Sequence, residues 1–189
     1  MHAEAPTITT ERLLLRPAVP ADIPAILQFF GDNAAFFKPF FPTLPDTYLT
    51  EAHWRWQIAQ HQQELRDDRG LKMFVFPQDA PTVIIGNVNF SNFVRGAAHF
   101  CHLGYNLAQS AQSLGYMSEA VRAACDYVFA ELGMHRIMAN YMPHNQPSGR
   151  LLRRLGFVVE GYARDYLRIN GRWEDHILTS LINPAWQPR

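Results

Sequence analysis

The sequence predicts an α+β fold in which a mixed, mostly antiparallel sheet of about seven strands carries helices on both faces. Segments with alternating apolar residues are separated by segments with helical periodicity. Their order is one strand, two helices, three strands, a helix, a strand, a helix and two strands. A strand, helix and strand between residues 98 and 142 need a parallel crossover inside this sheet. The length suits a single domain over residues 1–189, with a core from about 10 to 183.

The N-terminal third is predicted to hold one strand and two helices. Residues 12–16 form a short strand, and Asp22 caps a helix over residues 23–30. Residues 36–42 (FFKPFFP) contain two prolines and cannot form a regular helix, so we expect an aromatic loop there. An amphipathic helix follows over about residues 47–66.

The remaining elements alternate more regularly. We expect strands over 71–76, 82–93, 98–107 and 135–142, helices after Gly115 and over 145–156, and a closing hairpin over 157–182. The helix after Gly115 has one apolar face, which consists of Met117, Ala120, Val121, Ala124 and Val128. Asn170-Gly171 is the strongest hairpin signal in the chain, because both residues tolerate the positive φ angles of a two-residue turn.

Composition excludes several classes of protein. There are 17 basic and 17 acidic side chains, so the formal net charge is zero and gives no indication of DNA binding. Two cysteines, Cys101 and Cys125, form no disulfide framework and no zinc-binding spacing, and we expect both to be buried in a reducing compartment. No metal site is expected. No apolar run suits a signal peptide or a membrane span, which indicates a cytoplasmic enzyme or binding protein.

The start of the helix after Gly115 is a candidate phosphate site. A predicted strand runs into this helix through a turn in which several backbone N–H groups point one way, and the helix dipole adds positive potential there. A glycine inside the first turn lets an anion approach the backbone without a Cβ in the way. The turn consists of Gln112, Ser113, Leu114, Gly115, Tyr116 and Met117. The alternative is an unremarkable loop glycine, and Asn145 can likewise be a helix cap and nothing more.

Several stretches together resemble the GNAT superfamily of acetyl-CoA-dependent N-acetyltransferases. They are TERLLLRP, LGYNL followed by QSLGYMSEA, and NQPSGRLLRRLGFVVEGYARD, and the resemblance extends over roughly residues 10–188. It is greatest to the branch that acetylates the N-termini of ribosomal proteins. It implies the GNAT fold, in which two central parallel strands splay apart and hold acetyl-CoA between them.

The resemblance assigns the candidate phosphate turn to the pyrophosphate of acetyl-CoA. Gln112 and Gly115 match the family pattern, whereas Ser113 and Met117 replace residues that are usually small. The pantetheine arm is expected to pair with the main chain of Tyr105, Asn106 and Leu107. Asn145 and Ser148 match positions that commonly contact the arm from the other side.

The resemblance also implies direct attack of an amine on the thioester, so neither cysteine needs to be a nucleophile. The resemblance leaves the identity of the general base open. The candidates are His102, which stands where many relatives have a glutamate, and Asp165 in the closing hairpin, with Glu160 as a weaker candidate. Leu152 stands where many relatives place a tyrosine acid. Ser148 or water is therefore expected to protonate the thiolate.

Candidate acceptor residues lie on one strand and in two aromatic regions. Asn87, Asn89 and Ser91 share a strand face, and a peptide backbone or neighbouring strands would satisfy them. The phenylalanines of the aromatic loop, Phe37 among them, form an apolar lip or belong to the core. The closing hairpin usually walls the acceptor site, which makes Tyr162 and Tyr166 candidates.

The leading hypothesis is an N-α-acetyltransferase that acts on the N-terminal alanine of a small-subunit ribosomal protein, either as a monomer or as a homodimer, with no membrane partner. A second hypothesis keeps the fold but makes the acceptor a small amine, such as a polyamine or an antibiotic. A third is an acetyl-CoA-binding ribosome-assembly factor that contacts RNA through Arg150, Arg153 and Arg154.

Overall fold

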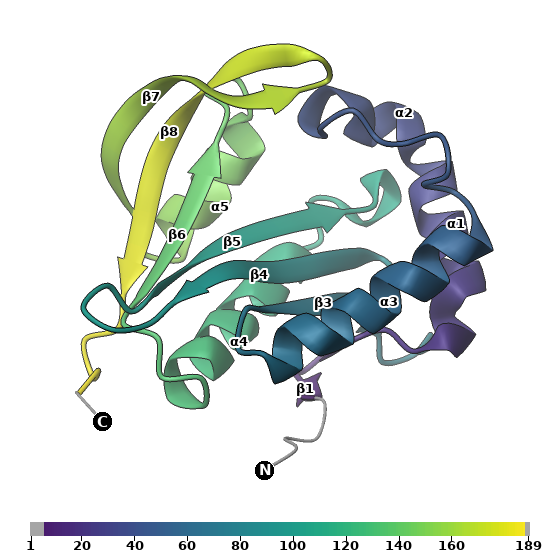
Figure 1. Ribbon diagram of the computed structural model, residues 1–189, viewed down its shortest axis with the longest axis horizontal. Helices are drawn as coiled ribbons and strands as arrows, with labels where there is room; N and C mark the ends of the chain where they lie inside the picture. The colour runs from purple at the N-terminus through teal and green to yellow at the C-terminus, as the bar shows by residue number, and fades with distance from the viewer. Residues whose placement is uncertain (1–5, 188–189) are drawn as a thin grey trace.

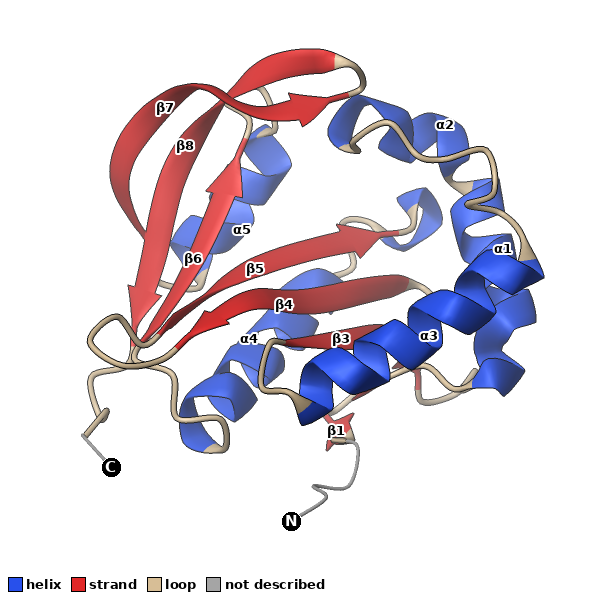
Figure 2. Cartoon of the chain, viewed as in Figure 1, coloured by secondary structure: helices blue, strands red, loops and turns tan. Residues whose placement is uncertain are grey.

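The computed structural model of the protein describes residues 6–187 and is built around one mixed sheet (Figures 1 and 2). The eight strands follow the order β1-β2-β3-β4-β5-β6-β8-β7, and β5–β6 is the parallel pair among antiparallel ones. They are β1 (Ile8–Thr9), β2 (Leu13–Arg16), β3 (Gly70–Pro77), β4 (Gly86–Val94), β5 (Phe100–Leu107), β6 (Arg136–Tyr141), β7 (Val158–Ile169) and β8 (Arg172–Ile182). The sheet confirms the predicted crossover and adds the two-residue strand β1.

Helices cover both faces of the sheet, as predicted (Figure 2). The helices are α1 (Ile23–Asp32), α2 (Ala34–Phe37), α3 (Glu51–Arg66), α4 (Tyr116–Ala130) and α5 (Gln146–Arg154), with short 3₁₀ turns at Pro20–Asp22, Lys38–Phe40 and Gln109–Ala111. α4 and α5 pack on one face, while α1 and α3 form a second core with the large side chains of β3 on the other. All five predicted apolar residues of α4 are buried, which confirms its periodicity.

Two local predictions were wrong. The aromatic segment is helical over Ala34–Phe37 and Lys38–Phe40, because Pro39 occupies the first turn of a 3₁₀ helix, where its missing N–H costs nothing. Asp22 precedes α1, but its side chain does not cap that helix. Its carboxylate accepts hydrogen bonds from the Val19 N–H and the Arg16 guanidinium instead.

The parallel pair at the centre of the sheet separates after a few residues. β5 and β6 pair at three positions, of which His102 with Met138 is the last, and the strands then diverge (Figure 1). The β5 edge over residues 103–107 therefore has no strand beside it. The β7–β8 hairpin arches over this opening. Its tip is tied to the segment that follows α2 and the Lys38–Phe40 turn, because the Asn170 N–H donates to the Phe41 carbonyl at 2.8 Å.

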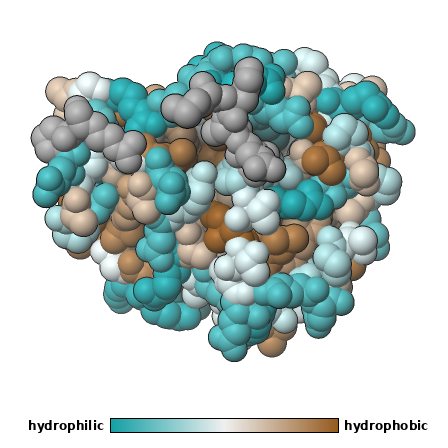
Figure 3. Space-filling view, turned by 90° about the horizontal axis from the view of Figure 1, so that it is seen from below, coloured by the Kyte–Doolittle hydropathy of each residue, from teal (hydrophilic) through white to brown (hydrophobic). Residues whose placement is uncertain are grey.

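The surface seen from below mixes hydrophilic side chains with separate apolar patches (Figure 3). Over residues 6–187, no helix combines the length and the apolar character that crossing a membrane requires. The same part of the chain brings together no group of three metal-ligating side chains.

Candidate functional site

The N-terminus of α4 has the geometry expected of an anion-binding helix end. Gly115 caps the helix with φ of 83°, a left-handed conformation that a residue with a Cβ adopts only with strain. The N–H of Glu119 bonds to the Gly115 carbonyl at 3.1 Å, whereas residues 116–118 have no carbonyl one turn earlier to accept their N–H groups. Residues 112–114 are exposed, and the side chain of Met117 is buried in the core, away from this turn. The predicted phosphate cradle is therefore open.

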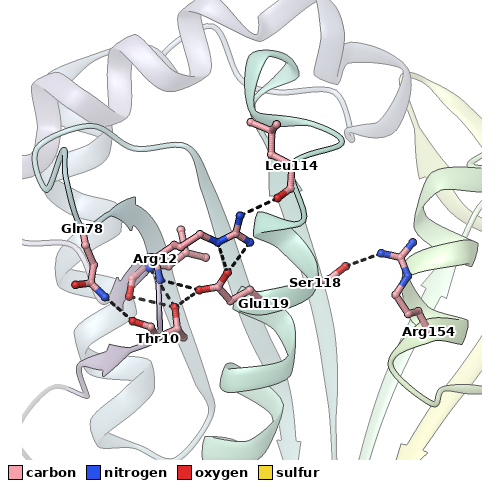
Figure 4. A network of polar contacts seen from close by, with 8 residues as sticks. Thr10, Arg12, Gln78, Leu114, Ser118, Glu119 and Arg154 are labelled. Atoms are coloured by element: carbon pink, nitrogen blue, oxygen red, sulfur yellow. Dashed lines mark hydrogen bonds and ion pairs between the residues drawn. The ribbon is translucent and has the colours of Figure 1, made fainter.

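A guanidinium that the sequence analysis did not single out supports this turn from below (Figure 4). Arg12 donates to the Leu114 carbonyl at 3.0 Å and to the Glu119 carboxylate at 2.8 Å, and Thr10 donates to the same carboxylate at 2.6 Å. Partial burial alone would raise the pKa of Glu119, but these hydrogen bonds outweigh it and lower the pKa. By fixing the Leu114 carbonyl, Arg12 holds one acceptor of the turn away from the place where an anion would bind.

A second arginine reaches the same helix end from the other side. Arg154, in the last turn of α5, donates to the Ser118 hydroxyl at 3.3 Å (Figure 4). Its side chain is exposed, and Ser118 belongs to the first turn of α4. The N-terminus of α4 therefore has a positively charged side chain beside it in addition to its dipole.

The back of β5 carries a hydroxyl pair where the sheet opens. The Tyr105 hydroxyl lies 2.7 Å from the Ser148 Oγ of α5. Burial raises the pKa of Tyr105 to about 12, so it stays protonated at neutral pH. The Ser148 N–H bonds to the cap residue Asn145 at 3.3 Å. A Cβ on Gly149 would lie 2.7 Å from the Tyr141 ring, so this glycine allows the close approach of α5 to β6 that brings Ser148 to Tyr105.

The front of the sheet carries a polar surface, because successive residues of a strand face opposite sides. Strand register aligns three rows across β3, β4 and β5: Gly70, Ser91 and His102; Lys72, Asn89 and Gly104; Phe74, Asn87 and Asn106. We call the polar members of this grid and the glycine among them the polar floor: Lys72, Asn87, Asn89, Ser91, His102, Gly104 and Asn106. It ends at the β5 edge that has no strand beside it.

Amide groups order the centre of the polar floor. The buried Asn87 Oδ1 accepts from the Asn89 amide at 3.0 Å and from the Asn106 amide at 3.1 Å. Asn89 and Asn106 thereby each commit one N–H to Asn87, and among the described residues their amide oxygens have no hydrogen-bond partner. These oxygens are available to accept hydrogen bonds from a ligand.

The comparisons with known proteins fit this geometry. The family model for the acetyltransferase (GNAT) domain matches residues 12–158. The chain is 41% identical over 181 residues to the ribosomal protein uS5-alanine N-acetyltransferase of Escherichia coli, a match that covers 96% of this chain and 93% of that enzyme. This chain belongs to the GNAT family of acetyltransferases.

Two further relatives agree with the assignment to the GNAT family. A probable N-acetyltransferase of Bacillus subtilis is 36% identical, with 91% of this chain and 94% of that protein covered. The crystal structure of a ribosomal-protein-S5-alanine acetyltransferase from Vibrio fischeri has a TM-score of 0.92 and 36% identity, and the match covers 97% of this chain and 100% of that one. The GNAT fold and the acetyltransferase activity expected from the sequence are thereby confirmed.

Within this GNAT fold, one of the two candidate bases lies at the opening between the strands. His102 is the β5 residue of the last β5–β6 pair, and its Nδ1 atom is buried without a hydrogen-bond partner among the described residues. Burial lowers the pKa of His102, which favours the neutral imidazole that accepts a proton. Asp165 instead lies exposed on the edge strand β7, where its N–H donates to the Asp175 carboxylate at 2.9 Å.

The hairpin tyrosines differ in their surroundings. Tyr162 is 58% exposed and its hydroxyl donates to Asp175. The Tyr166 hydroxyl accepts from the Asn140 amide of β6 at 3.1 Å. Asn140 is two residues beyond Met138, the partner of His102, so it shares the polar-floor side of the sheet. Tyr166 is therefore nearer the polar floor than Tyr162.

Two other candidate residues, Phe37 and Glu160, are engaged elsewhere. Phe37 is 4% exposed and packs against Phe41 in the second core, so its ring contributes to packing. Glu160 is ion-paired with Arg136 and accepts from the Ser180 hydroxyl at 2.8 Å.

Both cysteines of the GNAT chain are buried, as expected. Burial raises the pKa of both thiols, to about 12 for Cys101. Neither thiol is a ready nucleophile.

Proposed function

We propose that this enzyme transfers the acetyl group of acetyl-CoA to the α-amine of an N-terminal alanine of ribosomal protein uS5, in the cytoplasm. Two observations support this proposal. The chain is 41% identical to the uS5-alanine N-acetyltransferase of E. coli, and its polar floor ends at the free edge of β5. A peptide N-terminus laid on this floor would meet a thioester lying along that edge.

We assign the donor to the opening between β5 and β6. The pyrophosphate would accept hydrogen bonds from the first N–H groups of α4, with Arg154 beside it. The unpaired edge of β5 over residues 103–107 offers main-chain groups to the amides of the pantetheine arm. The thioester would then lie between the polar floor and the hydroxyl pair of Tyr105 and Ser148.

The reaction needs one proton removed and one supplied. The neutral amine attacks the thioester carbon, the N–C bond forms, and the C–S bond breaks. In this proposal Ser148 gives its proton to the leaving thiolate while Tyr105 hydrogen-bonds the serine oxygen, and solvent then returns a proton to Ser148. The amine proton leaves on the polar-floor side. Since successive residues of β5 face opposite sides, acid and base are kept apart by the sheet itself.

We propose His102 as the group that takes the amine proton, directly or through water, with Asp165 as the competing candidate. Free α-amines titrate near 7.7–8.0, so the base matters most at low pH. We expect His102→Gln to lower kcat/KM by roughly 10²-fold at about pH 6.5 and much less at about pH 9. Asp165→Asn is the matched control. A pH profile in which Asp165→Asn shows the loss and His102→Gln does not would exchange their roles.

The polar floor also argues against a polyamine acceptor. Lys72 lies in it beside Asn89, and burial lowers the pKa of this lysine although Glu64 partly offsets the effect. A polycation would place further positive charge there. The test is to incubate the enzyme and acetyl-CoA with an alanine-initiated uS5 peptide or with spermidine, and to measure the mass of each. Acetylation of spermidine alone would refute the proposed acceptor.

A further inference from the structure

Gly104 leaves a vacant position in the middle of the polar floor. It lies in the interior of β5, where a glycine ordinarily weakens a strand, and it is exposed. A Cβ built on Gly104 would have no heavy atom within 4 Å. The glycine is therefore not required by packing in the described structure, and a methyl group would project into free space.

Three polar residues border this space. Asn89 is the cross-strand partner of Gly104, while His102 and Asn106 precede and follow it on the same face of β5. The fourth side faces the opening, because β6 diverges from β5 after His102. We call the space over Gly104, bounded by Asn89, His102 and Asn106, the notch.

We propose that the notch receives the first residue of the acceptor and that Gly104 limits the size of its side chain. The inference rests on the proposed function and specifies how that acceptor is selected. The amide oxygens of Asn89 and Asn106 would accept hydrogen bonds from the amine, and the first side chain would occupy the space that a Cβ at position 104 would fill.

A methyl group at position 104 should not disturb the fold, because a Cβ there would contact no heavy atom within 4 Å. Gly104 lies in a regular strand without positive φ, so alanine is compatible with its backbone. The notch also lies on the polar-floor face, whereas the Tyr105 hydroxyl and Ser148 lie on the other. A methyl group at position 104 should therefore affect the acceptor and spare the donor.

The test compares Gly104→Ala with the wild type on two peptides that differ only in an N-terminal alanine or glycine. Because a single methyl group changes selection by roughly 10–200-fold, we expect kcat/KM for the alanine peptide to fall in that range. The glycine peptide should lose at most a few-fold, so the preference between the two shifts by about tenfold or more. Acetyl-CoA affinity, measured by calorimetry, should change less than about twofold.

Gly161→Ala is the matched control, since Gly161 also has free space around its Cβ position but lies on the edge strand β7. It should leave both peptides unaffected. Equal losses for both peptides, no loss for either, or a large loss of acetyl-CoA affinity in Gly104→Ala would overturn the notch. Failure of the wild type to acetylate any peptide would overturn the proposed function and the notch with it.

Discussion

Tyr105→Phe removes a single hydroxyl from the back of the opening and tests the proton-donor assignment. The hydroxyl lies 2.7 Å from the Ser148 Oγ, and Tyr105 is buried enough to raise its pKa to about 12. It therefore remains a hydrogen-bond donor throughout the range in which the enzyme would be assayed. The change preserves the ring and its packing, so the lost hydrogen bond is the principal difference.

The size of the effect follows from that hydrogen bond. A buried hydrogen bond contributes about 0.5–1.5 kcal/mol net, which corresponds to a loss of roughly 2- to 12-fold in kcat if the hydroxyl only orients Ser148 and supports its proton transfer. Ser148→Ala removes the donor itself and should cost roughly 10²–10⁴-fold. If Tyr105 acts through Ser148, as proposed, the double variant should be no slower than Ser148→Ala alone.

The assay is the release of CoA, followed with a thiol reagent under saturating peptide. Buried Cys101 and Cys125 should give little background. Acetyl-CoA affinity and the thermal midpoint are measured for each variant, since Ser148→Ala keeps the backbone N–H that bonds to Asn145. If the losses of the two single variants multiply in the double variant, the hydroxyls act independently. A loss below about threefold for Ser148→Ala would assign the proton to water.

Three further outcomes are expected. Arg154→Gln should weaken acetyl-CoA binding about tenfold, and more at low salt, because it removes a charged donor beside Ser118. Arg153→Gln, at an exposed neighbouring position, should leave the affinity unchanged, and calorimetry measures both variants. Burial lowers the pKa of His61 to about 4, so from pH 6.5 downward the unfolded chain binds a proton that the folded chain does not. The free energy of unfolding should therefore fall by up to about 3 kcal/mol as the pH is lowered from 6.5 to about 4. Urea unfolding of His61→Gln should show a smaller fall over the same range. Cys101→Ala and Cys125→Ala should each retain most activity, and mass spectrometry should find no acetylated enzyme; a trapped adduct would indicate an acyl-enzyme instead.

Features that depend on neighbouring residues were predictable from the sequence. The apolar stripe of α4 and the glycine at its start follow from periodicity and from the conformations that glycine permits. The hairpin turn was predictable in the same way. Asn170 and Gly171 have φ of 45° and 80°, the positive values that a type I′ turn requires. In each case the signal and the structure lie within a few residues of each other.

Features that join distant segments were not predictable in this way. The bonds from Arg12 to Leu114 and Glu119 span more than a hundred residues, and the strand that precedes them, Ile8–Thr9, is too short to leave a periodic pattern. The aromatic segment was misjudged because the rule that proline breaks helices applies to helix interiors, and Pro39 begins a short helical turn.

The polar floor shows why the residues on the acceptor side could not be fully predicted from the sequence. The sequence indicates that Asn87, Asn89 and Ser91 share a face, but only strand register decides that Lys72 and Gly104 flank Asn89 and that His102 lies opposite Ser91. A shift of one residue between β4 and β5 would exchange the face of Gly104 for that of Tyr105.

That single register also relates the two faces of β5 to one reaction. Gly104 opens on the polar floor and Tyr105 points to Ser148 behind the sheet, although the two residues are adjacent in the chain. The parallel pairing ends two residues before Gly104, so the free edge of the strand begins where both faces carry the proposed functional groups. An acetyl group held along this edge would be reached by an amine from one side and by a proton donor from the other. In the proposed mechanism, the divergence of β5 and β6 would therefore make room for the cofactor and also give both faces of β5 access to the bond that is exchanged.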